Sequence, residues 1–313
     1  MAHRYRLRVG ETTFRVSNYL LLALISLVTL YPFWFVIQAS FTDPTVRIRL
    51  LWPRAYYYVN YWLVFVHSGV WGASIWNAYL ITILRVGVTV PLMLVVTGAA
   101  AFALTRKELK ARRTIITYYF ITMFVSGGLI PYYMLIRALG LLNTFFVFVF
   151  PMLYSVWTMI VMKTSFQGLP EGLVGAALID GASYGRIFFK IILPLSIPMI
   201  TTLGLFQAVW HWNDWFVGSF FIKAPKLWPL QTFLRYAVVT VGGPENIAYS
   251  LGGAANNPEE LAQDPRIIAQ LIKVTSESVK YAFIVVTTMP ILLVYPFIQR
   301  YFIKGVLIGS IKE

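Results

Sequence analysis

Six apolar stretches recur along the chain, and each is long enough to cross a lipid bilayer as a helix of about 20 residues. Polar segments separate them. The third stretch is the least regular, because 126–133 (SGGLIPYY) places two glycines and a proline near its end. The pattern predicts an all-α, polytopic membrane protein with six transmembrane helices. Their expected ranges are 18–41, 76–104, 114–136, 144–164, 195–222 and 281–303.

The composition agrees with this pattern. The chain is 58% hydrophobic and only 12% charged, whereas soluble domains carry about a quarter charged residues. The aromatic share of 17% is typical of proteins whose Trp and Tyr side chains collect at membrane interfaces. The apolar stretch Tyr19–Phe41 is longer than a signal peptide and lacks a small-residue cleavage site, so we expect a retained span.

The net charge of +14 could indicate a nucleic-acid partner, but the placement of the basic residues favours membrane topology as its cause. Fifteen of the 26 Lys and Arg residues lie in the alternate segments that share a side with the N-terminus. Ten lie on the other side, mostly in two long loops, where the positive-inside rule counts least. We therefore expect both termini in the cytoplasm and no nucleic-acid partner. The expected organisation is a tail at 1–17, a six-span domain at 18–303 with a cytoplasmic loop at 165–194 and an outer loop at 223–280, and a tail at 304–313.

The second outer loop exceeds fifty residues, and a connector of that length normally does more than connect. Its centre is rich in turn-forming residues without a steady period. We expect a helix at 258–272, where Asn257 supplies the N-cap and Pro258 the first helical position.

Catalysis is not expected of this chain. It contains neither a GxxxxGK[ST] phosphate loop nor an HExxH or GxSxG motif, and it has three histidines and no cysteine. We therefore predict no catalytic residues, no metal ligands and no cofactor bound by the chain itself. A gradient-driven transporter would need titrating groups inside its spans, and such groups are few: Arg85 in the second stretch, and His211 and Asp214 in the fifth.

The Trp-rich segment at 210–215 (WHWNDW) allows two interpretations. In one, Arg85 pairs or snorkels near the outer interface, and the tryptophans belong to an aromatic belt. In the other, a water-filled cavity uses the tryptophan rings to stack on a sugar and the polar side chains to hydrogen-bond its hydroxyls. The candidate cavity residues are Trp210, Trp212, Asn213 and Asp214.

The cytoplasmic loop before the fifth stretch predicts a short helical hairpin. Pro170 suits a helix start, and small residues crowd 171–180, where they permit close approach of another backbone. Asp180-Gly181 predicts a helix stop with a glycine at positive φ, and Ser183 can cap an amphipathic helix that runs to Pro194. These features alone leave open whether the hairpin lies on the membrane surface or contacts another protein.

This hairpin resembles the conserved cytoplasmic loop in the membrane subunits of binding-protein-dependent ABC importers. That loop reads Glu-Ala-Ala, two residues, Asp-Gly-Ala, then a Phe and an Ile-x-Leu-Pro ending. The matching residues are Ala176, Ala177, Asp180, Gly181, Ala182, Phe188, Ile191, Leu193 and Pro194. Gly175 stands where the family has Glu, and Glu171 lies one helical turn earlier. The resemblance implies a type I importer permease fold in which this loop is the coupling helix of an ATPase subunit.

Further segments are similar to the carbohydrate-uptake branch, specifically to its second, maltose-type membrane subunit. They are 98–113, 126–144, 209–216 and 295–313. The details favour relatives that import oligo- or polysaccharide fragments, such as rhamnogalacturonan or alginate pieces. The resemblance therefore implies a multi-pass protein of the bacterial cytoplasmic (inner) membrane.

The resemblance also implies partners: a second homologous permease in a pseudo-twofold heterodimer, two ATPase subunits that hold ATP and Mg²⁺, and an extracytoplasmic solute-binding protein that delivers the saccharide. The residues expected to couple to the ATPase are Glu171, Gly175, Ala176, Ala177, Asp180, Gly181, Ala182, Ser183, Arg186 and Ile187. The segment expected to contact the binding protein contains Gly252, Gly253, Asn256 and Asn257. Two alternatives are a gradient-driven transporter or channel, and a membrane scaffold subunit that transports nothing.

Overall fold

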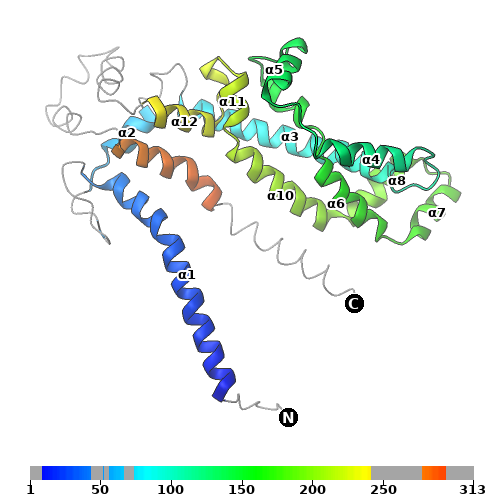
Figure 1. The fold of residues 1–313 in the computed structure, drawn as a ribbon, viewed down its shortest axis with the longest axis horizontal. Coiled ribbons are helices and arrows are strands. Elements are labelled where there is room, and N and C mark those ends of the chain that lie inside the picture. Colours follow the sequence, from blue (N-terminus) through cyan, green and yellow to red (C-terminus); the bar gives the residue numbers. More distant parts are fainter. Residues whose placement is uncertain (1–8, 44–51, 53–55, 67–73, 241–276, 294–313) are drawn as a thin grey trace. The chain divides into compact units, whose positions relative to one another are not determined.

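The computed structural model describes residues 9–43, 52, 56–66, 74–240 and 277–293. Over these residues the regular structure is helical (Figure 1), and a single isolated bridge pairs Thr42 with Tyr56. The chain divides into two compact units. The first comprises Met1–His67 and Val238–Val286, and the second comprises Ser68–Ala237 and Thr287–Glu313.

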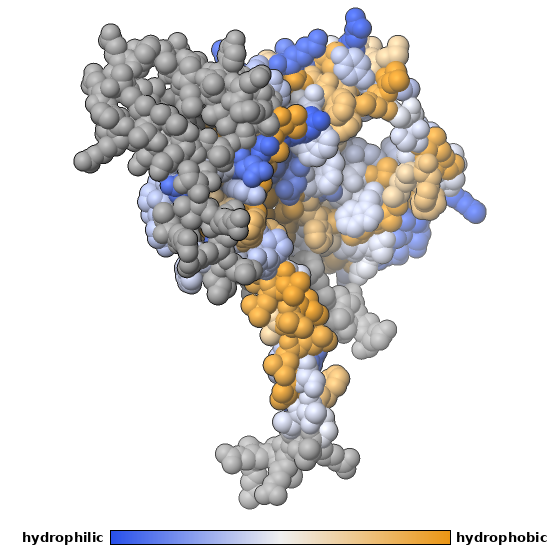
Figure 2. Space-filling view, turned by 60° about the vertical axis from the view of Figure 1, so that its left-hand side comes forward, coloured by the Kyte–Doolittle hydropathy of each residue, from blue (hydrophilic) through white to orange (hydrophobic). Residues whose placement is uncertain are grey.

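The first unit contains α1 (Val9–Phe41) and α2 (Val59–Val66). Apolar side chains cover most of α1, and Figure 2 shows them as a continuous hydrophobic surface. Such a surface is unfavourable in water and suits the hydrocarbon core of a bilayer. The first predicted span is thus one helix, and the more polar residues 9–17 extend it at its start.

A buried hydrogen-bond cluster holds this unit together. Asn60 of α2 donates from Nδ2 to the carbonyl oxygen of Ser40 at 3.0 Å, and Ser278 Oγ lies 3.0 Å from Asn60 Oδ1. The Ser40 hydroxyl is 2.6 Å from the Tyr61 hydroxyl. Because unpaired polar groups are costly inside apolar surroundings, this cluster fixes the end of α1 against α2 and the helical residues 277–286.

The second unit is built on three helices that pack together (Figure 1): α3 (Ile75–Ala103), α6 (Val156–Gln167) and α10 (Ile197–Asn213). Serines start two of them. Ser74 Oγ accepts from the Asn77 amide at 3.2 Å, and Ser155 Oγ accepts from the Thr158 amide at 3.3 Å, so both satisfy N-terminal backbone donors. The remaining helices are α4 (Arg112–Thr122), α5 (Leu129–Ala138), α7 (Glu171–Ile179), α8 (Tyr184–Ile187), the π-helix η4 (Phe188–Ile192), α9 (Leu193–Leu195), α11 (Phe216–Phe221) and α12 (Leu230–Thr240), with 3-10 turns at Phe145–Phe148 (η2), Phe150–Met152 (η3) and Pro225–Leu227 (η5).

Only part of the span prediction holds over the described residues. Two helices, Gly10–Phe41 and Ile75–Ala103, are long and apolar enough to cross a membrane. Two more spans arise if bent pairs are counted: Phe145–Met152 with Val156–Gln167, bent by 45°, and Tyr184–Leu195 with Ile197–Asn213, bent by 83°. The count of six and the orientation of the termini stay predictions.

The other predicted spans differ from continuous helices for local reasons. The stretch 114–136 divides into α4 and α5, and Gly128 has φ +80° in the break between them. The stretch 195–222 divides where Asp214 separates α10 from α11. Of the stretch 281–303, the described part is helical within residues 277–293. The predicted helix at 258–272 and the tail at 304–313 lie outside the described residues.

Candidate functional site

The hairpin turn forms as its sequence predicts. α7 ends at Ile179 with Asp180 as its C-cap, and Gly181 adopts φ +77°, a left-handed conformation that costs glycine little. The Ala182 amide donates to the Ala177 carbonyl at 2.9 Å, and the Gly181 amide donates to the Leu178 carbonyl at 3.0 Å. This pair of bonds is the Schellman arrangement, and it satisfies carbonyls that the end of α7 would otherwise leave unpaired.

The second arm of the hairpin continues directly into the helical bundle. Ser183 Oγ accepts from the Arg186 amide at 3.4 Å and caps α8. The backbone then passes through the π-helix η4 and α9 before the 83° bend to α10. The predicted helix end at Pro194 is close to this bend, which occurs at Ser196.

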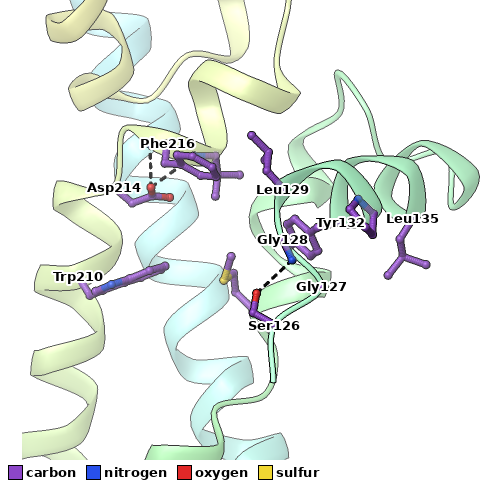
Figure 3. A pocket seen from close by; sticks show the side chains of 12 residues that line it. Ser126, Gly127, Gly128, Leu129, Tyr132, Leu135, Trp210, Asp214 and Phe216 are labelled. Carbon is purple, nitrogen blue, oxygen red and sulfur yellow. Dashed lines mark hydrogen bonds between the residues drawn. The ribbon is translucent and has the colours of Figure 1, made fainter. Parts of the chain in front are cut away.

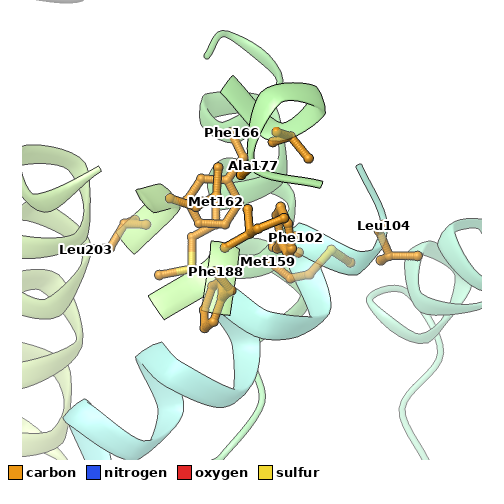
Figure 4. Packing of buried hydrophobic residues seen from close by; sticks show 12 residues of the cluster. Phe102, Leu104, Met159, Met162, Phe166, Ala177, Phe188 and Leu203 are labelled. Carbon is orange, nitrogen blue, oxygen red and sulfur yellow. The ribbon is translucent and has the colours of Figure 1, made fainter. Parts of the chain in front are cut away.

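One face of the hairpin is anchored in an apolar core (Figure 4). Val174 and Ala177 of α7 and Ile187 of α8 are buried there. They pack in one cluster with residues of α3, α6, η4 and α10, namely Ala101, Phe102, Leu104, Met159, Met162, Phe166, Phe188, Ile192 and Leu203. A fully buried large apolar side chain contributes roughly 1.5–3 kcal/mol, so the hairpin is held by packing against three long helices.

The opposite face of α7 is exposed and, apart from Ile179 at its end, carries only small residues. Gly172, Gly175, Ala176 and Ile179 follow the i, i+3, i+4, i+7 spacing of one helix face, and all four are exposed. A Cβ placed on either glycine would meet nothing within 4 Å. Ile179 is 88% exposed at the end of this face. Ile179 was not singled out from the sequence, although the helical spacing places it on this face.

The structure separates the predicted coupling residues into two groups. Ala177 and Ile187 face the core, where they fix the hairpin, and Ala182 is half-buried. The others are exposed: Glu171, Gly175, Ala176, Asp180, Gly181, Ser183 and Arg186. Glu171 forms an exposed ion pair with Lys107 at 3.0 Å, which joins α7 to the segment after α3. Contact of these residues with an ATPase stays a prediction.

A buried ion pair lies elsewhere in the second unit. The Arg85 guanidinium of α3 is fully buried and pairs with the Asp214 carboxylate. It also donates to the Asp214 carbonyl oxygen at 3.1 Å, lies 3.5 Å from His211 Nδ1, and sits 4.7 Å from the centre of the Phe148 ring. Arg85 therefore pairs with a carboxylate, which is one of the two arrangements expected for it in the aromatic-belt interpretation.

Asp214 and Trp210 line a cavity of about 710 Å³ (Figure 3). Its other lining residues are Ser126, Gly127, Gly128, Leu129, Pro131, Tyr132, Leu135, Met152, Phe216 and Val217. A second cavity of about 450 Å³ shares Trp210 and Asp214 and adds Asn213. Trp212 lines neither, and its indole N–H is buried without a hydrogen-bond partner in the described part of the chain.

Sequence reasoning thus found one wall of the larger cavity and missed the opposite one. Residues 126–133 were singled out as an irregularity in a span and as part of a segment similar to the carbohydrate-uptake branch, but their glycines and proline carry no chemical signature of a cavity wall. The expected binding-protein segment, with Gly252, Gly253, Asn256 and Asn257, lies outside the described residues.

Comparison with known proteins identifies the chain. The sequence profile described as "Binding-protein-dependent transport system inner membrane component" matches residues 95–308. The chain belongs to this family. The match spans the hairpin and all the residues that line the larger cavity. The permease is therefore a membrane-inserted transport subunit of an ABC importer, as its hairpin sequence indicated.

Several relatives resemble the permease along nearly its whole length. It is 31% identical to the polygalacturonan/rhamnogalacturonan transport system permease protein YtcP of Bacillus subtilis (strain 168), over 96% of this chain and 98% of that one. It is 35% identical to protein LplC of the same organism, over 96% and 95% of the two chains. Among solved structures, it superposes with a TM-score of 0.79 and 26% identity on a bacterial ABC transporter involved in the import of the acidic polysaccharide alginate, covering 94% of this chain and 98% of that one.

Proposed function

We propose that the permease is one of two homologous membrane subunits in an ATP-driven importer of oligosaccharides or polysaccharide fragments. A solute-binding protein delivers the saccharide outside, and one of two ATPase subunits, which bind ATP and Mg²⁺, docks on this hairpin inside. The observation that carries this proposal is the two-sided hairpin: its exposed face of small residues can admit another protein, and its buried face packs into the helical bundle.

The packing explains how force can enter the membrane domain. Val174 and Ala177 of α7 share a core with Phe102 of α3, Met162 of α6 and Leu203 of α10. Protein interiors are close-packed and transmit displacement rather than absorbing it. Movement of α7 by a closing ATPase dimer would therefore move these three helices together and open the cavity to one side of the membrane after the other.

The relatives support a polymeric sugar as the cargo. One carries polygalacturonan and rhamnogalacturonan in its name, and the solved importer handles an acidic polysaccharide. We propose fragments of an acidic polysaccharide as the substrate class. A neutral cargo such as the arabinooligosaccharides named for a relative from Halalkalibacterium halodurans, which is 26% identical, is the competing choice.

The test is uptake by vesicles that contain both permeases and both ATPases, supplied with the loaded binding protein. ATP-dependent uptake of oligogalacturonates is expected, and D180K should abolish it, because a long cation replaces an exposed carboxylate at the hairpin turn. E11K is the matched control: it makes the same charge change at an exposed residue whose ion pair with Arg15 contributes little. Uptake by this chain alone under a gradient would favour a secondary transporter, and no uptake under any condition would favour a scaffold.

A further inference from the structure

The larger cavity in the second unit has two walls of different chemistry. Trp210 near the end of α10 and Asp214, which directly follows this helix, form one wall. Figure 3 shows the Trp210 ring directed across the cavity towards Ser126 and Gly127. Tyr132 and Leu135 of α5 lie on that second side. A volume of about 710 Å³ is within the range of small-molecule sites.

Trp210 is available to a ligand. Half of its side chain is exposed, although it lies next to the fully packed His211. An indole ring offers a large, flat apolar surface with little conformational freedom to lose. The C–H face of a sugar ring complements such a surface, whereas its hydroxyl edge needs hydrogen-bonding groups nearby.

Asp214 can provide one of those hydrogen bonds. Its Oδ1 accepts from the Phe216 amide at 2.9 Å and the Val217 amide at 3.4 Å, and its Oδ2 accepts from Arg85. A carboxylate has about four acceptor positions, so about one is left for a hydroxyl donor. Arg85 neutralises the charge, so this wall would not repel a saccharide that carries carboxylates of its own.

The opposite wall supplies a second polar group. Ser126 Oγ accepts from the Gly128 amide at 3.3 Å and keeps its own hydroxyl proton to donate. A lipid chain in this cavity would leave both Asp214 and Ser126 without a new partner, which is unfavourable for polar groups removed from water. A flat ring and a carboxylate on one wall, with a hydroxyl group on the other, fit a sugar better than an acyl chain.

We propose that this cavity is a saccharide subsite carried by this permease. Trp210 stacks on one sugar ring, Asp214 accepts a hydroxyl proton, and the Ser126 hydroxyl donates from the other wall. Arg85 is a positioning residue, because it touches Asp214 and not the cavity. This inference rests on the proposed function and assigns a location for the cargo within it.

The first experiment uses the absence of cysteine in this chain. In the assembled importer, S126C places a single thiol at the cavity, and T122C places one at an exposed site at the end of α4 that does not line it. Maleimide labelling of this chain is followed by mass spectrometry with and without oligogalacturonate-loaded binding protein and ATP. Saccharide should slow labelling of S126C several-fold and leave T122C unchanged. Equal labelling with and without saccharide, as expected for a lipid-filled or partner-filled cavity, would overturn the proposal.

The second experiment measures the saccharide concentration for half-maximal uptake in vesicles. W210A should raise this concentration about tenfold, and W210F should raise it less. W157A is the matched control, since Trp157 is also 50% exposed on a neighbouring helix and lines neither cavity. Normal uptake by W210A would overturn the subsite and leave the proposed function standing, whereas absence of uptake by the unaltered importer would overturn the proposed function.

Discussion

Arg85 of α3 and Asp214 of the α10–α11 turn form an ion pair whose cationic partner is fully buried. The two residues are 129 positions apart, and the pair joins α3 to the α10–α11 turn. Asp214 also caps α11 through the Phe216 amide at 2.9 Å. The cation, the carboxylate and the start of α11 therefore form one structural unit.

We expect R85A to lower the free energy of unfolding by about 3–5 kcal/mol, because it leaves the Asp214 carboxylate buried without its cation. Thermal unfolding of the purified permease in detergent measures this change. R137A removes an arginine that is exposed on α5 and should change stability by less than about 0.5 kcal/mol. If R85A and R137A unfold at the same temperature, the pair contributes nothing to the fold.

The local features of the hairpin were predictable from sequence because they depend on neighbouring residues. Asp180-Gly181 gives the positive-φ turn and Ser183 gives the cap, and both follow from side-chain chemistry within a few positions. The first two spans were also predictable, since their long apolar runs become α1 and α3 with few changes at the ends.

Features that depend on tertiary packing were not predictable in this way. Pro194 marks a helix end close to Ser196, but the 83° size of the bend there and the π-helix Phe188–Ile192 are not visible in the residue pattern. The partner of Arg85 was equally hidden, because periodicity along one helix contains no information about a residue on another helix. Residues 126–129 form a cavity wall only because Trp210 and Asp214 lie opposite them in the folded chain.

A substitution at the hairpin turn should separate turn geometry from helix propensity. We expect G181A to destabilise the hairpin by about 1–2 kcal/mol, because alanine tolerates the left-handed conformation poorly. G175A should instead stabilise α7 by about 0.5–1 kcal/mol, since Gly175 is helical with open space around it. Hydrogen exchange of the α7 amides in the assembled importer reports both changes. Equal exchange rates in the two variants would show that the turn conformation at Gly181 does not determine the stability of the hairpin.

Restoring the family's glutamate tests the docking surface itself. A Cβ at Gly175 meets nothing within 4 Å, so G175E should not lower the thermal stability of the permease. The new side chain would still project from the exposed face that we assign to the ATPase. We expect weaker co-purification of the ATPase subunits with G175E than with G175A. Full ATPase recovery with G175E would move the docking surface away from this face of α7.

Two adjacent phenylalanines allow a matched test of force transmission. Phe188 is buried in the cluster, where its ring stacks on Phe102 at 5.8 Å between centroids, whereas Phe189 is 56% exposed. F188A should lower the free energy of unfolding by about 3–5 kcal/mol, because it opens a cavity between the hairpin and α3. F189A should lower it far less.

If the F188A importer still assembles, it should also take up less saccharide per ATP hydrolysed, since a loosened core transmits α7 movement incompletely. Uptake and ATP hydrolysis measured on the same vesicles give this ratio. An unchanged ratio in F188A, combined with the expected loss of stability, would mean that the cluster supports the fold without coupling it to the ATPase.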